Sequence, residues 1–500
     1  MGLLIKPLPA YTGPYAVSTT DLELPVSQPR ADFSPALLKA TGEPALKLDT
    51  VLVTLFYPAN PNKGGCGKRL NWVQRPVSQT ANGYARFLGK NAFLVKALFW
   101  LVGARITLPV EGDKALAYKV DPEEKSEKTA TRTSEETLVG EQLSKEDQFP
   151  LVIFSHGLSG TRTTYSQWCG EIASRGSIVA CIEHRDGSGP ISVVRLENGK
   201  ERVVDYIRAE EHLQFPAPHR PQTSLEFRTA QLSFRLAEID SVLSLLTRLN
   251  EGEGAAVAAE NRRKDYGGEG VVGKWLVGWE GRINLNEVVM AGHSFGGAIT
   301  IQALRAGLPQ FPFVRGIALD PWADPIPPAP APSSLSATPS RTSNPAPTAA
   351  PASSGEEKDK VPLDIKVPLL VINSESFTLW RVHYKLVRGI VEAVEGGKGW
   401  LMTLIGSIHT SFSDFPTLSP YLSRRSGSRV QPNLATHQIV EICFEFLSGQ
   451  GTAGAVLGKE VEEGDDRGAR PGEGEKEEGG KRRVMEGEVG GIRMHVRGQE

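Results

Sequence analysis

The sequence predicts an α/β protein in which helices flank a mostly parallel central sheet. Short apolar runs rich in Val and Ile recur through the middle of the chain, and segments with helical periodicity separate them. The runs are apolar throughout, which is typical of parallel strands covered on both faces rather than of strands with one face in water. Alternation of such strands with helices indicates the α/β class.

Six strands and several helices follow from these patterns. The strands are expected at 149–155, 177–182, 287–291, 314–319, 367–372 and 400–405. Apolar residues spaced by three, four and seven predict a long amphipathic helix over 225–249. Shorter helices are expected around 163–175 and 434–448, and another begins directly after the third strand.

Four segments are expected to lie outside the folded core. They are 121–148, 251–281, about 325–360 and the tail 451–500. The first is charged and lacks aromatic residues, the second and fourth mix Gly with charge, and the third is rich in Pro, Ala and Ser. Such compositions bury too little apolar area to offset chain entropy. We therefore expect one domain over 1–450 with three disordered insertions, followed by a disordered tail.

The composition excludes several functional classes. Hydrophobic residues make up 40% of the chain, and the net charge of −2 argues against a nucleic-acid partner. Four Cys in 500 residues exclude a disulfide scaffold. They lack paired metal-ligand spacing, and the chain has no HExxH, CxxC or calcium-loop motif. We therefore expect neither a metal nor a cofactor, and the sequence indicates no oligomeric state.

The hydropathy pattern gives an expectation for location. No apolar run reaches the ~18 residues of a membrane span. The apolar run at the N-terminus is shorter than the roughly seven residues of a signal-peptide core. We therefore expect a soluble cytoplasmic protein without a signal peptide or a transmembrane segment.

One apolar stretch suggests a peripheral contact with membranes. Residues 92–102 are too short to cross a bilayer, and Lys96 interrupts them. They form either a buried helix on the sheet or an interfacial helix whose apolar face enters lipid. In the second case the membrane-facing candidates are Phe93, Leu94, Phe99 and Trp100.

The most informative motif is Gly292-His293-Ser294-Phe295-Gly296, which fits G-x-S-x-G. A predicted strand precedes it and a predicted helix follows, as the nucleophile elbow of the α/β-hydrolase fold requires. Glycines two residues before and after the serine leave room for a sharp turn that exposes the hydroxyl. The following helix directs N–H groups at developing negative charge. Ser294 is therefore the predicted nucleophile; the alternative is a Gly-rich turn with an incidental serine.

An acid and a histidine should follow the serine in this fold. Asp320 comes directly after the predicted strand 314–319, with Asp324 as its nearest rival. His409 lies on a loop just past the strand at 400–405. The other histidines after Asp320 are His383, His437 and His495. We therefore assign the acid to Asp320 and the base to His409, although a turn residue and a structural loop histidine are the alternatives.

Two backbone N–H groups are candidates for an oxyanion hole. One belongs to Phe295, the residue after the nucleophile, and the other to Leu158, in the loop after the first predicted strand. An ordinary strand–helix turn is the alternative for the Leu158 loop. The charged run 183–186 follows another predicted strand and is interpreted as an ion-paired loop that braces the site.

Seven ordered blocks resemble the platelet-activating factor acetylhydrolases, both the plasma lipoprotein-associated and the intracellular type. The blocks lie at 13–21, 154–165, 179–186, 292–298, 316–322, 372–375 and 406–415. The resemblance implies calcium-independent hydrolysis of the sn-2 acyl group of phospholipids, with acetyl or short oxidised chains preferred. It also implies the same nucleophile, acid, base and oxyanion donors, and a membrane-docking helix near 92–102. The Pro-rich insertion, the tail and the missing secretion signal depart from the family, so lipoprotein association is not implied.

The combined hypothesis is a serine esterase that hydrolyses platelet-activating factor and related phospholipids through an acyl-enzyme. A short-chain carboxylesterase or a lipase of the same fold is the first alternative, because fold alone does not determine substrate. The second alternative is an inactive interaction scaffold, and the complete set of catalytic residue types argues against it.

Overall fold

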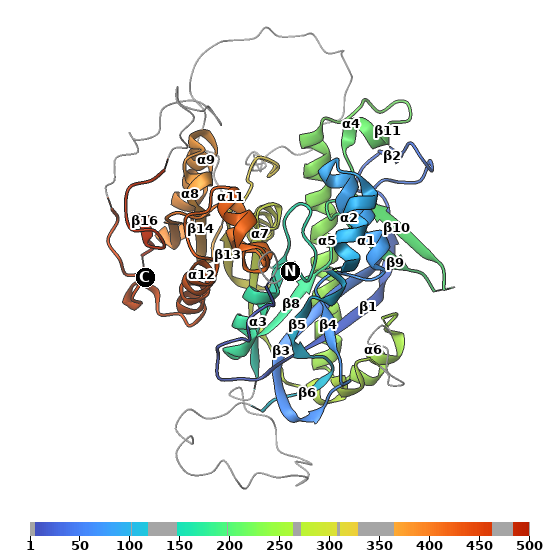
Figure 1. Ribbon diagram of the computed structural model, residues 1–500, viewed down its shortest axis with the longest axis horizontal. Helices are drawn as coiled ribbons and strands as arrows, with labels where there is room; N and C mark the ends of the chain where they lie inside the picture. The colour runs from blue at the N-terminus through green and yellow to red at the C-terminus, as the bar shows by residue number, and fades with distance from the viewer. Residues whose placement is uncertain are drawn as a thin grey trace, which may run out of the picture.

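The computed structural model describes eight stretches of the 500-residue chain (Figure 1). They are 6–101, 103–118, 148–197, 199–263, 272–307, 311–328, 365–462 and 484–499. Most of the predicted insertions at 121–148 and 325–360 lie outside these described residues. No helix among them is long and apolar enough to cross a membrane.

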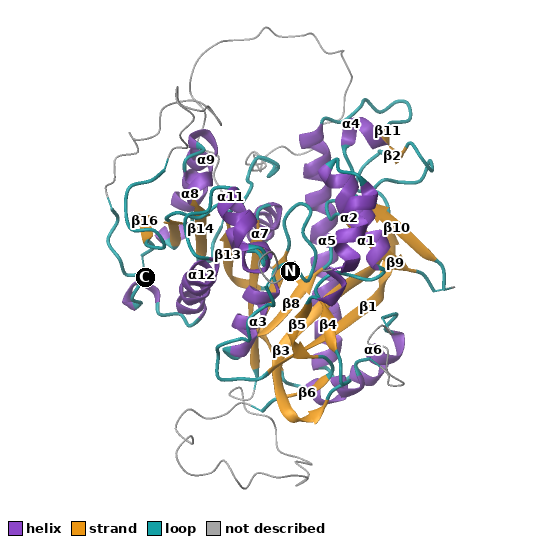
Figure 2. Cartoon of the chain, viewed as in Figure 1, coloured by secondary structure: helices purple, strands orange, loops and turns teal. Residues whose placement is uncertain are grey.

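A ten-stranded sheet runs through the centre of the molecule (Figure 2). In spatial order its main strands are β1 (Val17–Arg30), β3 (Leu48–Gly64), β8 (Ile178–Ile182), β7 (Phe149–Ser155), β12 (Ile283–His293), β13 (Phe313–Leu319), β14 (Leu369–Ser374), β15 (Gly399–Leu404) and β16 (Ile492–Val496). The run from β8 to β15 is parallel. Antiparallel strands complete both ends, and β6 (Lys114–Leu116) pairs with β3.

Helices cover both faces of the sheet, as the continuous apolar strands require. The α-helices are α1 (Val77–Leu88), α2 (Ala92–Leu101), α3 (Ser166–Ser174), α4 (Ala209–His212), α5 (Ser224–Asn250), α6 (Gly254–Glu260), α7 (Phe295–Ala306), α8 (Glu375–Thr378), α9 (Arg381–Glu392), α10 (Phe415–Leu418), α11 (Pro420–Arg425) and α12 (Pro432–Leu447). One core contains side chains of α5, α7 and α9, and the other contains those of α3 and α12. Alternate residues of one strand enter different cores: Ile153 of β7 lies in the first and Phe154 in the second.

Short elements join this framework. The small two-stranded sheets pair β2 (Leu37–Leu38) with β11 (Leu213–Gln214), β4 (Arg69–Asn71) with β5 (Thr107–Glu111), and β9 (Ile191–Arg195) with β10 (Glu201–Asp205). The 3₁₀ turns are η1 (Gly103–Arg105), η4 (Lys274–Trp279), η5 (Glu395–Gly397), η6 (His409–Phe412) and η7 (Gly451–Ala453).

The predicted α/β class is confirmed, and all six predicted strands belong to the central sheet. Sequence analysis did not identify the long N-terminal strands β1 and β3. They pair with each other antiparallel from Val17 opposite Pro58 onward. Buried Ser, Thr, Asp and Glu side chains interrupt the apolar pattern of β1, and therefore periodicity alone did not reveal it.

The segment 251–281 differs from the expected excursion. It contains α6 and η4, and Val257, Leu276 and Trp279 are buried in the core. Gly254 lies against the Leu276 backbone, where a Cβ atom would come within 2.1 Å of the carbonyl oxygen. The average composition of the segment concealed a few large apolar side chains that suffice to fix it on the core.

The tail also differs from the expectation. Residues 492–496 form β16, which pairs antiparallel with β15 at the edge of the sheet. Ile492 and Met494 are buried in the core, and His495 Nε2 lies 2.8 Å from Thr403 Oγ1. The Gly-rich and charged context masked this short strand. The single-domain boundary at 450 stays a prediction.

We predict that His495 makes stability depend on pH. Burial lowers its pKa in the folded protein to about 4, against an ordinary value of 6.5. Below pH 6.5 the unfolded chain binds a proton that the folded chain does not bind, so the wild type loses stability as pH falls. The stability advantage of wild type over His495→Gln should shrink by about 1.4 kcal/mol per pH unit between 6.5 and 4. Urea unfolding of both proteins across this range measures the difference, and a constant difference would contradict the prediction.

Candidate active site

The turn between β12 and α7 places Ser294 at the carboxyl edge of the sheet. Ser294 has φ 57° and ψ −118°, a backbone conformation that L-residues rarely adopt. Its N–H donates to Leu319 O at 2.9 Å, which ties the turn to the end of β13. A Cβ atom on Gly296 would come within 1.9 Å of Ser155 O. The small residues are therefore required because the turn packs directly against β7.

Ser294, His409 and Asp320 form a hydrogen-bonded chain. His409 Nδ1 lies 2.7 Å from Asp320 Oδ2, and His409 Nε2 lies 2.9 Å from Ser294 Oγ. Because a carboxylate only accepts, Nδ1 carries the proton and Nε2 accepts the Ser294 hydroxyl. The three side chains follow the ends of three different strands, β12, β13 and β15. Their catalytic roles are a proposal.

The end of β14 holds the Asp320 carboxylate. The Ser374 N–H donates to Oδ1 and the Ser374 hydroxyl to Oδ2, each at 2.7 Å. Asp320 is fully buried and has φ 46°. These bonds leave Oδ2 directed at His409. Ser374 lies in the block 372–375 that resembles the family, but its sequence context predicts no role for it. The contact with Asp320 arises only from the pairing of β13 with β14.

Aromatic rings and a charged brace hold His409. Its imidazole stacks on Phe377, with ring centroids 4.3 Å apart, and lies 4.5 Å from the His293 ring on another side. Glu375 braces the loop that carries it, because its carboxylate accepts the Gly406 N–H and pairs with Arg429. The ring is thus confined in plane and in position.

A tyrosine–histidine bridge links the loop of Leu158 to the loop of His409. The Gly157 N–H donates to Tyr165 Oη at 3.2 Å, and this hydroxyl donates to His293 Nδ1 at 2.8 Å. His293 Nε2 then donates to the His409 carbonyl at 3.0 Å. Burial holds the pKa of His293 well below its ordinary value, so the ring is the neutral relay that these bonds require.

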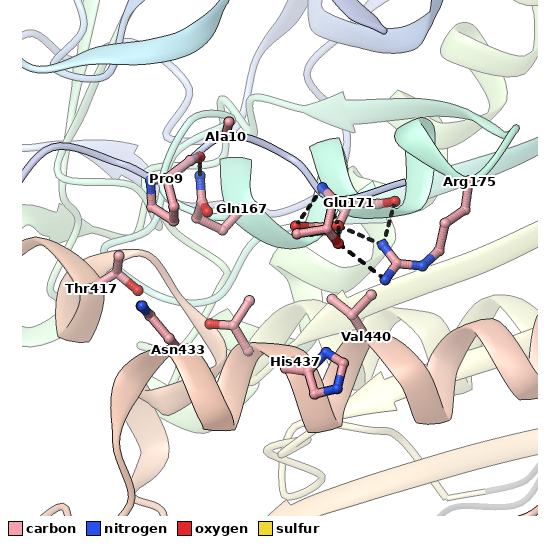
Figure 3. A pocket seen from close by; sticks show the side chains of 11 residues that line it. Pro9, Ala10, Gln167, Glu171, Arg175, Thr417, Asn433, His437 and Val440 are labelled. Atoms are coloured by element: carbon pink, nitrogen blue, oxygen red, sulfur yellow. Dashed lines mark hydrogen bonds and ion pairs between the residues drawn. The ribbon is translucent and has the colours of Figure 1, made fainter. Parts of the chain in front are cut away.

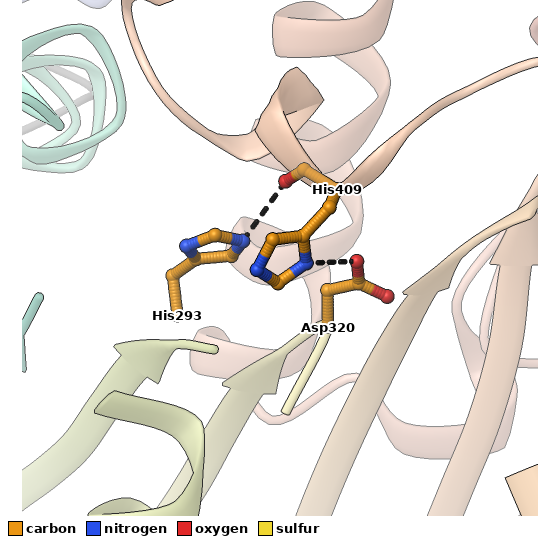
Figure 4. A group of neighbouring side chains, drawn as sticks. All are labelled: His293, Asp320 and His409. Atoms are coloured by element: carbon orange, nitrogen blue, oxygen red, sulfur yellow. Dashed lines mark hydrogen bonds and ion pairs between the residues drawn. The ribbon is translucent and has the colours of Figure 1, made fainter. Parts of the chain in front are cut away.

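His293, Asp320 and His409 also form a group whose ligand atoms lie within 4.8 Å of one another (Figure 4). The nitrogen atoms that a metal ion would need are already occupied. His293 Nε2 and His409 Nδ1 both donate hydrogen bonds, to a carbonyl and to a carboxylate respectively. In this arrangement both of these nitrogens carry protons and cannot bind a metal ion at the same time.

The two predicted oxyanion donors belong to residues next to Ser294 in the chain and next to Gly157, which packs against Ser294. Phe295 is the first residue of α7, and Leu158 follows Gly157. A Cβ atom on Gly157 would lie 2.8 Å from Ser294 Cβ and 3.1 Å from His293 O. The Leu158 loop therefore packs against Ser294 itself, and a side chain at 157 would obstruct this approach.

The rival residues stand outside the hydrogen-bonded chain formed by Ser294, His409 and Asp320. Asp324 is exposed and accepts a hydrogen bond from Trp322 Nε1. His383 on α9 is buried and accepts the Ala323 N–H, and His437 on α12 is exposed. The fourth rival, His495, lies on β16.

The run 183–186 is buried; its Glu, Arg and Asp residues are ion-paired, as the interpretation requires, whereas His184 and Glu238 share a hydrogen bond and burial shifts both of their pKa values toward the neutral forms. Glu183 pairs with Arg162, His184 with Glu238, Arg185 with Glu23, and Asp186 with Arg235. All four side chains of the run are at most 1% exposed. The run therefore lies beneath the site and cannot contact a substrate.

The sequence also matches a known protein family. The family model described as "Platelet-activating factor acetylhydrolase, isoform II" matches residues 123–333 and 357–466. The chain belongs to this family. It is accordingly a hydrolase of carboxylic esters.

Individual proteins show how distant the relatives are. A "Platelet-activating factor acetylhydrolase" of Gallus gallus is 23% identical over 444 residues, which is 87% of this chain and 81% of that protein. A "Putative phospholipase A2" of Schizosaccharomyces pombe is 28% identical over 59% of this chain and 58% of that protein. A solved ferulic acid esterase from Streptomyces cinnamoneus has a TM-score of 0.49 at 16% identity, covering 89% of this chain and 92% of that one.

The described part of this acetylhydrolase-family chain contains a strongly exposed apolar helix. On α2, Phe93 is 77%, Leu94 67% and Trp100 62% exposed. The helix therefore does not lie buried on the sheet. Of the four membrane-facing candidates, Phe99 does not point outward. Its ring packs on Tyr84, with ring centroids 5.3 Å apart.

A small pocket lies away from the elbow, between the start of the chain, α3 and α12 (Figure 3). Its volume is about 140 Å³. Arg175 in its wall pairs with Glu171 and with Glu441, so one guanidinium bridges two carboxylates there. We assign it no role.

We predict that Gly157→Ala lowers ester hydrolysis at least about tenfold, because misplacement of an oxyanion donor by a fraction of an ångström weakens a bond needed in the transition state. The measurement is kcat on a water-soluble acetate ester. Gly389→Ala on α9 is the matched control, since a Cβ atom there meets nothing within 4 Å. Equal activity of the two variants would contradict the prediction.

Proposed function

We propose that this protein hydrolyses the sn-2 acetyl or short acyl ester of platelet-activating factor and related phospholipids. The observation that carries the proposal is the chain of hydrogen bonds from Ser294 through His409 to Asp320 at the carboxyl edge of a parallel sheet. Family membership and the printed names of the relatives support the phospholipid substrate. Those names also favour it over the carboxylesterase, lipase and scaffold alternatives.

The proposed mechanism begins with attack by Ser294 on the ester carbonyl. His409 Nε2 takes the hydroxyl proton as the Oγ–carbon bond forms, and the Asp320 carboxylate stabilises the imidazolium. The N–H groups of Phe295 and Leu158 bind the negative oxygen of the tetrahedral intermediate. His409 then protonates the departing sn-2 oxygen of the glycerol, and an acyl-enzyme remains on Ser294.

Water completes the cycle. His409 removes a proton from a water molecule, which attacks the acyl-enzyme, and the second tetrahedral intermediate uses the same two N–H groups. Collapse releases the carboxylic acid and returns the proton to Ser294. Every step uses side chains and backbone groups of this chain, so we propose that catalysis needs no calcium.

The proposed substrate is tested with phosphatidylcholines that differ only in sn-2 chain length, from acetyl to palmitoyl, assayed with a calcium chelator. We expect kcat/KM to fall steeply with chain length, and Ser294→Ala to lose more than about 10³-fold in rate on every substrate. Equal kcat/KM values on all chain lengths would contradict the proposed preference for short acyl groups. Activity on simple esters alone would favour the carboxylesterase alternative.

We further propose that α2 contacts the membrane that supplies the substrate. Its exposed apolar residues lie on a helix too short to span lipid, which is typical of an interfacial helix. Phe93 and Trp100 would enter the interface, whereas Phe99 would stay packed on the protein.

Vesicle binding tests the proposed contact between α2 and the membrane. Phe93→Ser combined with Trp100→Ser should weaken partitioning into phosphatidylcholine vesicles at least about tenfold, because each change removes apolar area from lipid. Turnover of a water-soluble ester should stay unchanged, since neither residue contacts the triad. Val382→Ser is the control, because Val382 on α9 is 76% exposed. An equal loss of vesicle partitioning in the control would contradict the proposal that α2 contacts the membrane.

A further inference from the structure

One fully buried arginine touches both sides of the oxyanion site. Arg235 on α5 points beneath the elbow, and its side chain is 0% exposed. Its NH1 group donates to the His156 carbonyl at 2.8 Å, just before the Leu158 loop. Its guanidinium carbon lies 4.4 Å from the centre of the Phe295 ring. The two predicted oxyanion donors thus have a common neighbour.

The same guanidinium also holds the far end of the Leu158 loop. Its NH2 group donates to Ser188 Oγ at 2.7 Å, and the Ser188 carbonyl accepts the Ser159 N–H at 2.8 Å. Ser159 has φ 56°, a strained conformation that needs such support. Leu158 therefore lies between two anchors that both lead to Arg235.

The rigid shape of the guanidinium suits this role. Nε of Arg235 donates to Asp186 Oδ2 at 2.9 Å, and NH1 donates also to Ser155 Oγ at 3.0 Å. A planar fork with several donors fixes these acceptors relative to one another, which a single ammonium group cannot do. The pairing with Asp186 offsets the cost of burying the charge.

Ser155 takes part in a second serine–histidine–carboxylate arrangement. His184 Nε2 lies 2.7 Å from Ser155 Oγ, and His184 Nδ1 lies 2.5 Å from Glu238 Oε2. All three side chains are fully or almost fully buried, so no substrate reaches them. Ser155 serves instead as a junction that joins β7 and β8 to Arg235.

We infer that Arg235 is a positioning residue that holds the Leu158 and Phe295 N–H groups in register for the oxyanion. It contacts neither substrate nor reacting atoms. It orders the Leu158 loop through His156 and Ser188, and the start of α7 through the Phe295 ring. The inference rests on the proposed function of Ser294 and extends it to a residue on a different helix.

The test compares Arg235→Lys with wild type on a water-soluble acetate ester and on its thiono analogue, in which sulfur replaces the carbonyl oxygen. Sulfur accepts hydrogen bonds weakly, so the rate ratio of the two esters reports on the oxyanion donors. We expect kcat to fall about 10²-fold with KM changed less than about threefold. The oxygen-to-sulfur ratio should fall about tenfold.

Arg228→Lys is the matched control. Arg228 lies seven residues earlier on α5, is buried, and bonds Gln231 and Tyr206 rather than the Leu158 loop. A purely structural role of Arg235 predicts similar losses and unchanged ratios in both variants, and that result would overturn the inference. Phe295→Leu removes the ring beneath the guanidinium, keeps the backbone N–H, and should lower the ratio in the same direction.

Three further outcomes are informative. If Arg235→Lys does not fold, Ser188→Ala and Phe295→Leu carry the test, and wild-type ratios in both would overturn the inference. If Ser294→Ala hydrolyses the acetate ester as fast as wild type, the proposed function is wrong, and the inference about Arg235 is wrong as well because it depends on that function. Ser294-dependent turnover with unchanged kcat in Arg235→Lys refutes the role of Arg235 alone.

Discussion

The structure depends on the close approach of the Ser294 turn to the end of β7. The turn holds a serine at positive φ, and such strain persists only where surrounding contacts determine the backbone. Those contacts are backbone to backbone: Gly296 lies against Ser155 O, and the Ser294 N–H bonds Leu319 O. No side chain could be inserted there without moving β7, β12 or α7. The sheet therefore fixes the direction of the hydroxyl.

The same packing creates a need for charge beneath the sheet edge. The loops after β7 and β8 end in polar residues that the helices cover, and buried polar groups must find partners. Arg235, Asp186, His184 and Glu238 supply them. Burial raises the pKa of Glu238 and lowers that of His184, so both shifts favour neutral forms. A buried ionic layer of this kind is weak evidence for stability and stronger evidence for a defined geometry, because a misplaced member leaves an unpaired charge.

The outer surface follows a different physical rule. Ser294, Asp320 and His409 lie at the carboxyl edge of the parallel strands, where open α/β sheets place their ligand sites. The exposed apolar side chains of α2 gain nothing from water and would gain free energy from lipid or another apolar partner. The proposed hydrolysis of phospholipids would need both features, since such substrates reside in aggregates. Here the first comes from the sheet, and the second from a helix inserted between β4 and β5.

Local sequence determined the parallel strands and the turn chemistry. Apolar runs and glycine spacing are short-range signals, so the six strands, the Ser294 elbow and the loop positions of Asp320 and His409 followed from the sequence alone. Averaged composition was a poorer guide, because three large apolar residues in 251–281 and a five-residue strand near the C-terminus outweighed their polar surroundings.

Only the tertiary structure decided which distant side chains support the site. Ser374 reaches Asp320 across strand pairing, Tyr165 reaches His293 from the residue before α3, and Arg235 reaches two loops from α5. Contacts between residues 50 to 130 positions apart leave no periodic pattern in one sequence. The physical reason is that such partners are selected by the packing of whole strands and helices, whereas the elbow is selected by the steric limits of its own few residues.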